Sequence, residues 1–167
     1  MLRLAEGIDR AIGAALRPLL FAGMAALIVS ITLQVVTRVF FTAFGWTEEV
    51  ARFLLVWLTF LGSVYAWHEH RHIAVTVLVE RLPDAARRAA TIVALVLALA
   101  FLLSLAWVGY EYMSIQSFQK SAAMRLPMSY VYAIIPVSAL LMAWFCLSDL
   151  LRAILAGKTP EFAEPAE

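Results

Sequence analysis

Apolar residues along the chain gather into four long blocks, each separated from the next by a short polar segment. The blocks run through residues 18–44, 50–67, 89–115 and 128–151. A helix needs about 20 residues to cross the hydrocarbon core of a bilayer, so these blocks have about the length of membrane spans. The pattern predicts an all-α membrane protein with four transmembrane helices in a single domain over residues 1–167.

Three shorter segments flank these blocks. In the first 17 residues, apolar side chains recur every four positions and arginines every seven, which predicts an amphipathic N-terminal helix lying on the membrane surface. The segment 73–82 is apolar but too short to span, and we expect it in the interface between the second and third helices, ended by Pro83. Asp84 then suits the start of the third helix. Residues 158–167 are polar and are predicted to form a flexible tail.

The distribution of Lys and Arg predicts the orientation of the helices. Of the 13 basic residues, nine fall on the side that holds both termini and the loop between the second and third helices, and four fall near the opposite helix ends. The positive-inside rule places the richer side in the cytoplasm. We therefore expect a multi-pass protein with both termini cytoplasmic.

Composition excludes several classes of function. The chain is 63% hydrophobic with a net charge of +1, which gives no indication of a nucleic-acid partner. Its single cysteine, Cys146, excludes an internal disulfide and is expected to act as a small apolar residue. No nucleophile stands beside a base, and no Gly-rich phosphate loop or pair of intramembrane carboxylates is present. We predict that the protein is not an enzyme and binds no cofactor.

His68, His70 and His72 form the only cluster of possible metal ligands. On a helix, only His68 and His72 would share a face, and two ligands make a poor site. A contact with a lipid headgroup or a partner protein is the expected role.

Two charges stand near the outer ends of the first and third helices. Arg38 and Glu111 lie at comparable depth, where a charge next to lipid is costly unless it is paired or reaches the headgroups. They are candidates for pairing with each other or with a partner subunit, and snorkelling to the headgroups is the alternative.

The start of the second helix carries a second polar group. Thr47 is predicted to cap this helix, and Glu48 and Glu49 to favour its positive end. Arg52 is placed to pair with either acid, and Trp46 is expected to anchor the interface. These roles in helix stability and membrane anchoring would account for every residue of the group. Two acids and an arginine at an outer surface would also suit docking of a soluble partner protein.

Three further positions concern helix packing. Gly62 and Ala66 form a small-xxx-small pair that would allow close helix contact. Pro127 suits the start of the fourth helix, whereas Pro136 lies within it and should kink it.

The chain resembles the small membrane subunits, or DctQ-like subunits, of tripartite ATP-independent periplasmic (TRAP) transporters. The resemblance covers the four-helix region and departs from the family at Met124, Arg125 and Ser129. The matching motifs, in order, are Arg38-Val39-Phe40, Trp46-Thr47-Glu48-Glu49, Arg52, Val56-Trp57, Phe60-Leu61-Gly62, His72-Ile73-Ala74-Val75, Leu126-Pro127-Met128, Tyr132 and Ile135-Pro136.

The resemblance implies a bacterial inner-membrane subunit that pairs with a large membrane subunit, which carries the substrate and sodium sites. A periplasmic binding protein would deliver the substrate transiently, often an organic acid such as a dicarboxylate. The small subunit would act as a fixed scaffold, with membrane lipids as its other contacts. The alternatives are a membrane anchor for a redox complex carrying haem, which the lack of His in the first, third and fourth helices disfavours, and a self-contained small transporter or channel.

Overall fold

The computed structural model describes residues 2–40, 44–69 and 84–155. Apart from an isolated bridge between Lys120 and Pro127, the regular structure of these residues is helical. In chain order the helices are α1 (Leu2–Phe40), α2 (Gly45–His68), α4 (Asp84–Ile115), the short 3-10 helix η1 (Gln116–Phe118), α5 (Met128–Tyr132) and α6 (Ile134–Leu155).

The all-α class and the four long apolar helices agree with the sequence prediction. The candidate membrane spans are Asp9–Phe40, Gly45–His68, Ala86–Phe118 and Met128–Ile154. The third helix does begin at Asp84, as predicted. The predicted interfacial segment 73–82 and the tail 158–167 fall outside the described residues.

The N-terminal amphipathic segment is helical but is not a separate helix. It runs without a break into the first span, and Pro18 lies inside α1. Leu16 is buried in the hydrophobic core, so this segment packs against the bundle. The segment therefore continues the first span, and its location at the membrane surface stays a prediction. Within its apolar face, Leu16 lies in the core and Ile12 packs against it.

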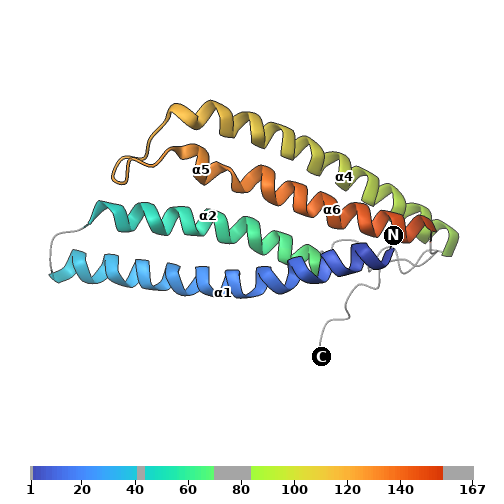
Figure 1. Ribbon diagram of the computed structural model, residues 1–167, viewed down its shortest axis with the longest axis horizontal. Helices are drawn as coiled ribbons and strands as arrows, with labels where there is room; N and C mark the ends of the chain where they lie inside the picture. The colour runs from blue at the N-terminus through green and yellow to red at the C-terminus, as the bar shows by residue number, and fades with distance from the viewer. Residues whose placement is uncertain (1, 41–43, 70–83, 156–167) are drawn as a thin grey trace.

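The four long helices lie side by side in the order α1, α2, α6, α4 (Figure 1). α1 packs on α2 and α4 packs on α6, and these two hairpins meet where α2 contacts α6. About 56% of the most apolar stretch of the fourth span is buried within the chain, against 11% in each of the first two. α6 is therefore the central helix of the bundle.

Small residues explain how α6 can be central. Ser138, Ala139, Ala143 and Cys146 are buried along it, and short side chains let neighbouring backbones approach closely. The core that surrounds them is apolar and draws on all four long helices. It comprises Leu16, Leu61, Val64, Leu102, Ile134, Met142, Ala143, Phe145 and Cys146.

The fourth span is broken near Pro136, as predicted. The interruption lies at Ala133, between α5 and α6, and Pro136 has no N–H to donate to the carbonyl of Tyr132. Gly109 of α4 packs against this break. A Cβ atom at Gly109 would lie 2.8 Å from Cγ2 of Ile135 and 3.3 Å from Cδ of Pro136. The part of the fourth span around Pro136 thus fits a neighbour without a side chain.

Gly62 makes no comparable contact. A Cβ atom there would meet nothing within 4 Å, so the close helix contact predicted for Gly62 and Ala66 is not made at Gly62 by the described residues.

The two glycines provide a matched test of the packing. Gly109→Ala should lower the free energy of unfolding by about 1–3 kcal/mol, because the new methyl group would overpack the contact with Ile135 and Pro136. Gly62→Ala should leave it unchanged or raise it by up to about 1 kcal/mol, since alanine favours a helix and the space is open. Denaturation of the purified chain in detergent measures both, and equal stabilities would contradict the close contact at Gly109.

Candidate functional site

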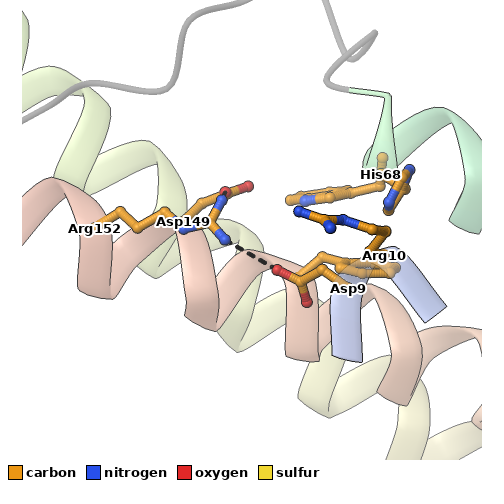
Figure 2. Close-up of a pocket in the computed structure, with 7 residues that line it drawn as sticks. Asp9, Arg10, His68, Asp149 and Arg152 are labelled. Atoms are coloured by element: carbon orange, nitrogen blue, oxygen red, sulfur yellow. Dashed lines mark hydrogen bonds and ion pairs between the residues drawn. The ribbon is translucent and has the colours of Figure 1, made fainter. Parts of the chain in front are cut away.

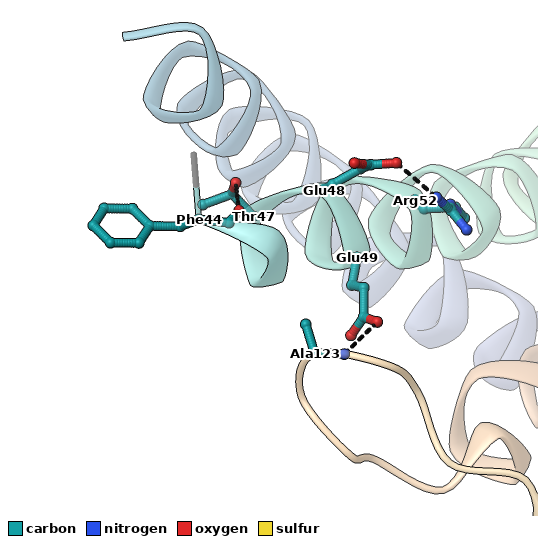
Figure 3. Close-up of polar contacts among 6 residues, drawn as sticks. All are labelled: Phe44, Thr47, Glu48, Glu49, Arg52 and Ala123. Atoms are coloured by element: carbon teal, nitrogen blue, oxygen red, sulfur yellow. Dashed lines mark hydrogen bonds and ion pairs between the residues drawn. The ribbon is translucent and has the colours of Figure 1, made fainter. Parts of the chain in front are cut away.

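The start of α2 is built differently from the prediction. The helix begins at Gly45, with Phe44 as the N-cap residue. Thr47 therefore lies within the first turn, where its side chain is fully buried and its Oγ1 donates to the carbonyl oxygen of Phe44 at 2.7 Å (Figure 3). The carbonyl oxygen of Thr47 accepts a hydrogen bond from Oγ of Ser30 in α1 at 3.1 Å. Thr47 ties α2 to α1 and is not the cap, because the helix starts two residues earlier.

Glu48 and Arg52 form the predicted ion pair within the helix. Their side-chain atoms Oε1 and Nη2 are 2.9 Å apart, and both side chains are more than 60% exposed. The pair lies on the surface, where such contacts stabilise by only about 0.3–0.5 kcal/mol. Neither residue contributes to the core, so both remain accessible to a partner.

Glu49 points away from this ion pair and hydrogen-bonds to the loop that precedes α5. Its carboxylate accepts hydrogen bonds from the backbone N–H of Ala123 at 2.8 Å and of Met124 at 3.0 Å. Figure 3 shows the side chain extending from α2 towards the loop that carries Ala123. This contact was not predicted from the sequence. One signal was available: successive helical residues point about 100° apart, so Glu48 and Glu49 could not both serve Arg52 equally.

This loop, residues 119–127, is closed by its own hydrogen bonds. The backbone N–H of Ser121 donates to the carbonyl oxygen of Leu126 at 2.9 Å, and the N–H of Met128 donates to the carbonyl oxygen of Gln119 at 2.8 Å. Arg125 adopts a left-handed backbone with φ of 54°. Lys120 and Arg125 are exposed in this loop. Next to it, the side chain of Phe118 is 93% exposed.

Pro127 is the N-cap residue of α5, which agrees with its predicted place at the start of the fourth span. We refer to this end of the bundle, formed by residues 44–52 and 116–128, as the Glu49 end.

The opposite end of the bundle is held by Asp9, and we call it the Asp9 end. Oδ1 of Asp9 accepts a hydrogen bond from Nε1 of Trp144 at 3.1 Å, and Oδ2 pairs with Arg152 at 3.1 Å. Arg152 also lies 4.0 Å from a carboxylate oxygen of Asp149. Figure 2 shows Asp9, Asp149 and Arg152 meeting near the start of α1 and the end of α6. Sequence reasoning missed this cluster, although an aspartate such as Asp149 at the edge of an apolar block was a usable signal.

His68 reaches the same end from α2. Its ring packs so closely on Gly13 that a Cβ atom there would lie 2.5 Å from Cε1. The ring also meets Phe145 edge-on, with the ring centroids 5.5 Å apart. His70 and His72 fall outside the described residues. No group of three metal-binding side chains occurs within the described part of the chain.

Arg38 and Glu111 are not brought together. Arg38 is exposed in the last turn of α1, and Glu111 is exposed on α4. Because α2 and α6 lie between these two helices, the proposed internal pair does not form. Trp46 and Trp57 are both at least 40% exposed on α2. Their proposed contacts with a membrane or partner stay predictions.

Residues 27–156 match the family model described as "Tripartite ATP-independent periplasmic transporters, DctQ component". The chain belongs to this DctQ family. It is thus a multi-pass membrane component of the transport machinery and not an enzyme.

Three relatives illustrate the range of similarity within the family. The isethionate TRAP transporter permease protein DctMQ of Oleidesulfovibrio alaskensis is 33% identical over 80% of this chain, which spans only 22% of that protein. A putative TRAP transporter small permease protein of Haemophilus influenzae is 42% identical over 43% of this chain and 45% of its own length. The sialic acid TRAP transporter small permease protein SiaQ of Vibrio cholerae is 25% identical over 80% of this chain and 79% of its own.

The role of Glu49 can be separated from that of its neighbour. In Glu49→Gln, the amide has one acceptor oxygen for two backbone donors, so we expect faster hydrogen exchange at Ala123 and Met124. Glu48→Gln is the control, since it breaks only an exposed ion pair and should leave those amides unchanged. Hydrogen exchange with mass spectrometry on the purified chain measures both. Equal exchange in the two variants would show that Glu49 does not hold the loop.

Proposed function

We propose that this DctQ-family chain is a stationary scaffold subunit of a TRAP-type importer in the bacterial inner membrane. It pairs with a large membrane subunit that carries the substrate and ion sites. A periplasmic binding protein supplies the substrate, an organic acid such as a dicarboxylate or a related carboxylate, and a sodium gradient drives import. Both termini of the chain are cytoplasmic, so the Glu49 end faces the periplasm.

The observation that carries this proposal is the position of the charges: the central stretches of the four described spans, residues 18–37, 53–67, 89–110 and 128–148, contain no Asp, Glu, Lys or Arg. Six serine and threonine hydroxyl groups within the described spans donate to the carbonyl oxygen four residues earlier in their own helix. Examples are Thr59 to Leu55 at 2.8 Å and Ser104 to Ala100 at 2.8 Å. Transport sites in membranes are instead built from charged groups or broken helices near the midplane. This arrangement supports translocation in another chain.

The lateral order of the helices supports a partner as well. With α1, α2, α6 and α4 side by side, the chain resembles a slab and exposes broad apolar faces (Figure 1). On α6, the exposed residues recur at alternating steps of three and four, the spacing used in packing between long helices. They are Val137, Leu140, Trp144, Leu147, Leu151 and Ile154. Such a surface suits helices of a second membrane subunit.

The relatives add an argument for the same partner. The name DctMQ of the Oleidesulfovibrio protein joins two component letters, and this chain matches 22% of its length. A component that can form part of one longer chain with another is expected to stay in contact with it. We infer a lasting complex, with the binding protein as the transient partner.

Deletion of this chain tests the scaffold proposal. We expect a large polytopic subunit to co-purify with the tagged chain, and uptake of the substrate to be lost in cells that lack the chain. Liposomes that contain this chain alone should show no transport. Full uptake without the chain would overturn the proposal, as would transport by the chain on its own.

The exposed pair Glu48 and Arg52 tests docking at the periplasmic face. We expect Glu48→Ala combined with Arg52→Ala to cost the fold only about 0.3–0.5 kcal/mol while lowering uptake at limiting binding protein. The amount of co-purified large subunit should be unchanged, which separates docking from assembly. Normal uptake at every concentration of binding protein would contradict a docking role for the pair.

A further inference from the structure

A pocket of about 330 Å³ opens at the Asp9 end, between α1, α2 and α6. A water molecule takes up about 30 Å³ of the liquid, so the pocket has room for a polar group of many atoms. Its charged lining consists of Asp9, Arg10, Asp149 and Arg152. His68 and the aromatic rings of Trp67 and Phe145 complete the wall.

Three candidate membrane spans end beside the pocket: the first begins at Asp9, the second ends at His68 and the fourth ends at Ile154. With the helices spanning a bilayer, these ends place the pocket near the lipid headgroups. Apolar surface also starts at its edge. Trp144 donates to Asp9 and belongs to the exposed apolar row of α6. A molecule with a polar head in the pocket could therefore lay its hydrocarbon part along the bundle.

The polar atoms of the pocket include both donors and acceptors. Arg10 is exposed, and its guanidinium makes no hydrogen bond or ion pair with the described residues. Nδ1 of His68 is buried and has no hydrogen-bond partner among the described residues. Asp9 uses its oxygens for Trp144 and Arg152, but a carboxylate has about four acceptor positions.

The net charge of the lining favours one class of ligand over another. The charges of the two arginines and two aspartates in the described lining cancel. A bare anion would leave the pocket with an uncompensated negative charge at the edge of a low-dielectric region, which is unfavourable. A headgroup with one phosphate and one ammonium keeps the balance: the phosphate suits Arg10, and the ammonium suits the aspartates.

We propose that this pocket binds the headgroup of a zwitterionic phospholipid with a primary ammonium, such as phosphatidylethanolamine. The ammonium donates to Asp9 and Asp149, and Arg10 donates to the phosphate in the planar geometry that guanidinium groups provide. The bound lipid fills the gap between the start of α1 and the ends of α2 and α6. This inference concerns the chain itself and does not depend on the proposed role in uptake.

Titration of the purified full-length chain with defined lipids tests the proposal. Dioleoyl phosphatidylethanolamine, phosphatidylcholine, phosphatidylglycerol and inorganic phosphate are added separately to the delipidated protein in detergent, and binding is followed by native mass spectrometry. We expect phosphatidylethanolamine to bind about tenfold or more tightly than phosphatidylcholine. The methylated ammonium of phosphatidylcholine cannot donate hydrogen bonds, and one such bond to a charged group accounts for about that ratio.

Two arginines of α1 give a matched pair of variants. Arg10→Gln should weaken binding of phosphatidylethanolamine by about tenfold or more, whereas Arg17→Gln should not, because Arg17 is exposed on α1 and does not line the pocket. Unfolding without lipid should be the same for both variants, which separates binding from folding. Equal lipid binding by the two variants would overturn the proposal. So would a preference for phosphatidylglycerol, or a response to inorganic phosphate equal to that for the lipid.

Discussion

Close packing around α6 is the interaction on which the rest of the structure depends. Within a bilayer, lipid tails are as apolar as leucine, so helices gain little by exchanging lipid contact for contact with one another. Van der Waals packing must supply the difference. The buried row of Ser138, Ala139, Ala143 and Cys146 allows α2 and α4 to approach α6 from two sides. Of the two outer helices, α1 packs on α2 and α4 packs on α6. Both can remain largely exposed because α2 and α6 hold the two hairpins together.

Polar contacts at the two ends then fix the register that apolar packing leaves loose. At one end Glu49 of α2 holds the loop that leads into α5, and at the other Asp9 of α1 holds Trp144 and Arg152 of α6. Each contact joins one helical hairpin to the other. Since polar groups near the midplane would be costly, the ends are where a membrane bundle can place such specific contacts.

The sequence predicted the number and class of the helices because hydropathy and length alone decide them. It also predicted the Glu48–Arg52 pair and the break near Pro136, since both are local. The contacts of Asp9, Glu49 and Thr47 were missed or misassigned because each depends on a residue 17 or more positions away, or on where α2 begins. The internal pairing of Arg38 with Glu111 failed for a related reason. Equal depth along two helices does not make them neighbours, and here α2 and α6 intervene.

The polar contacts at both ends of the bundle restrict how the two hairpins can move relative to each other. Two hairpins joined only by apolar contacts could slide or rotate against each other, since such contacts have little directional preference. Directional hydrogen bonds at Glu49 and Asp9 oppose both motions, because either motion would leave charged groups unpaired beside the membrane. A subunit that resists shear in this way can hold a fixed position while a neighbouring chain moves substrate. The same argument explains why a lipid headgroup suits the Asp9 end, where it would join three helices at their common boundary.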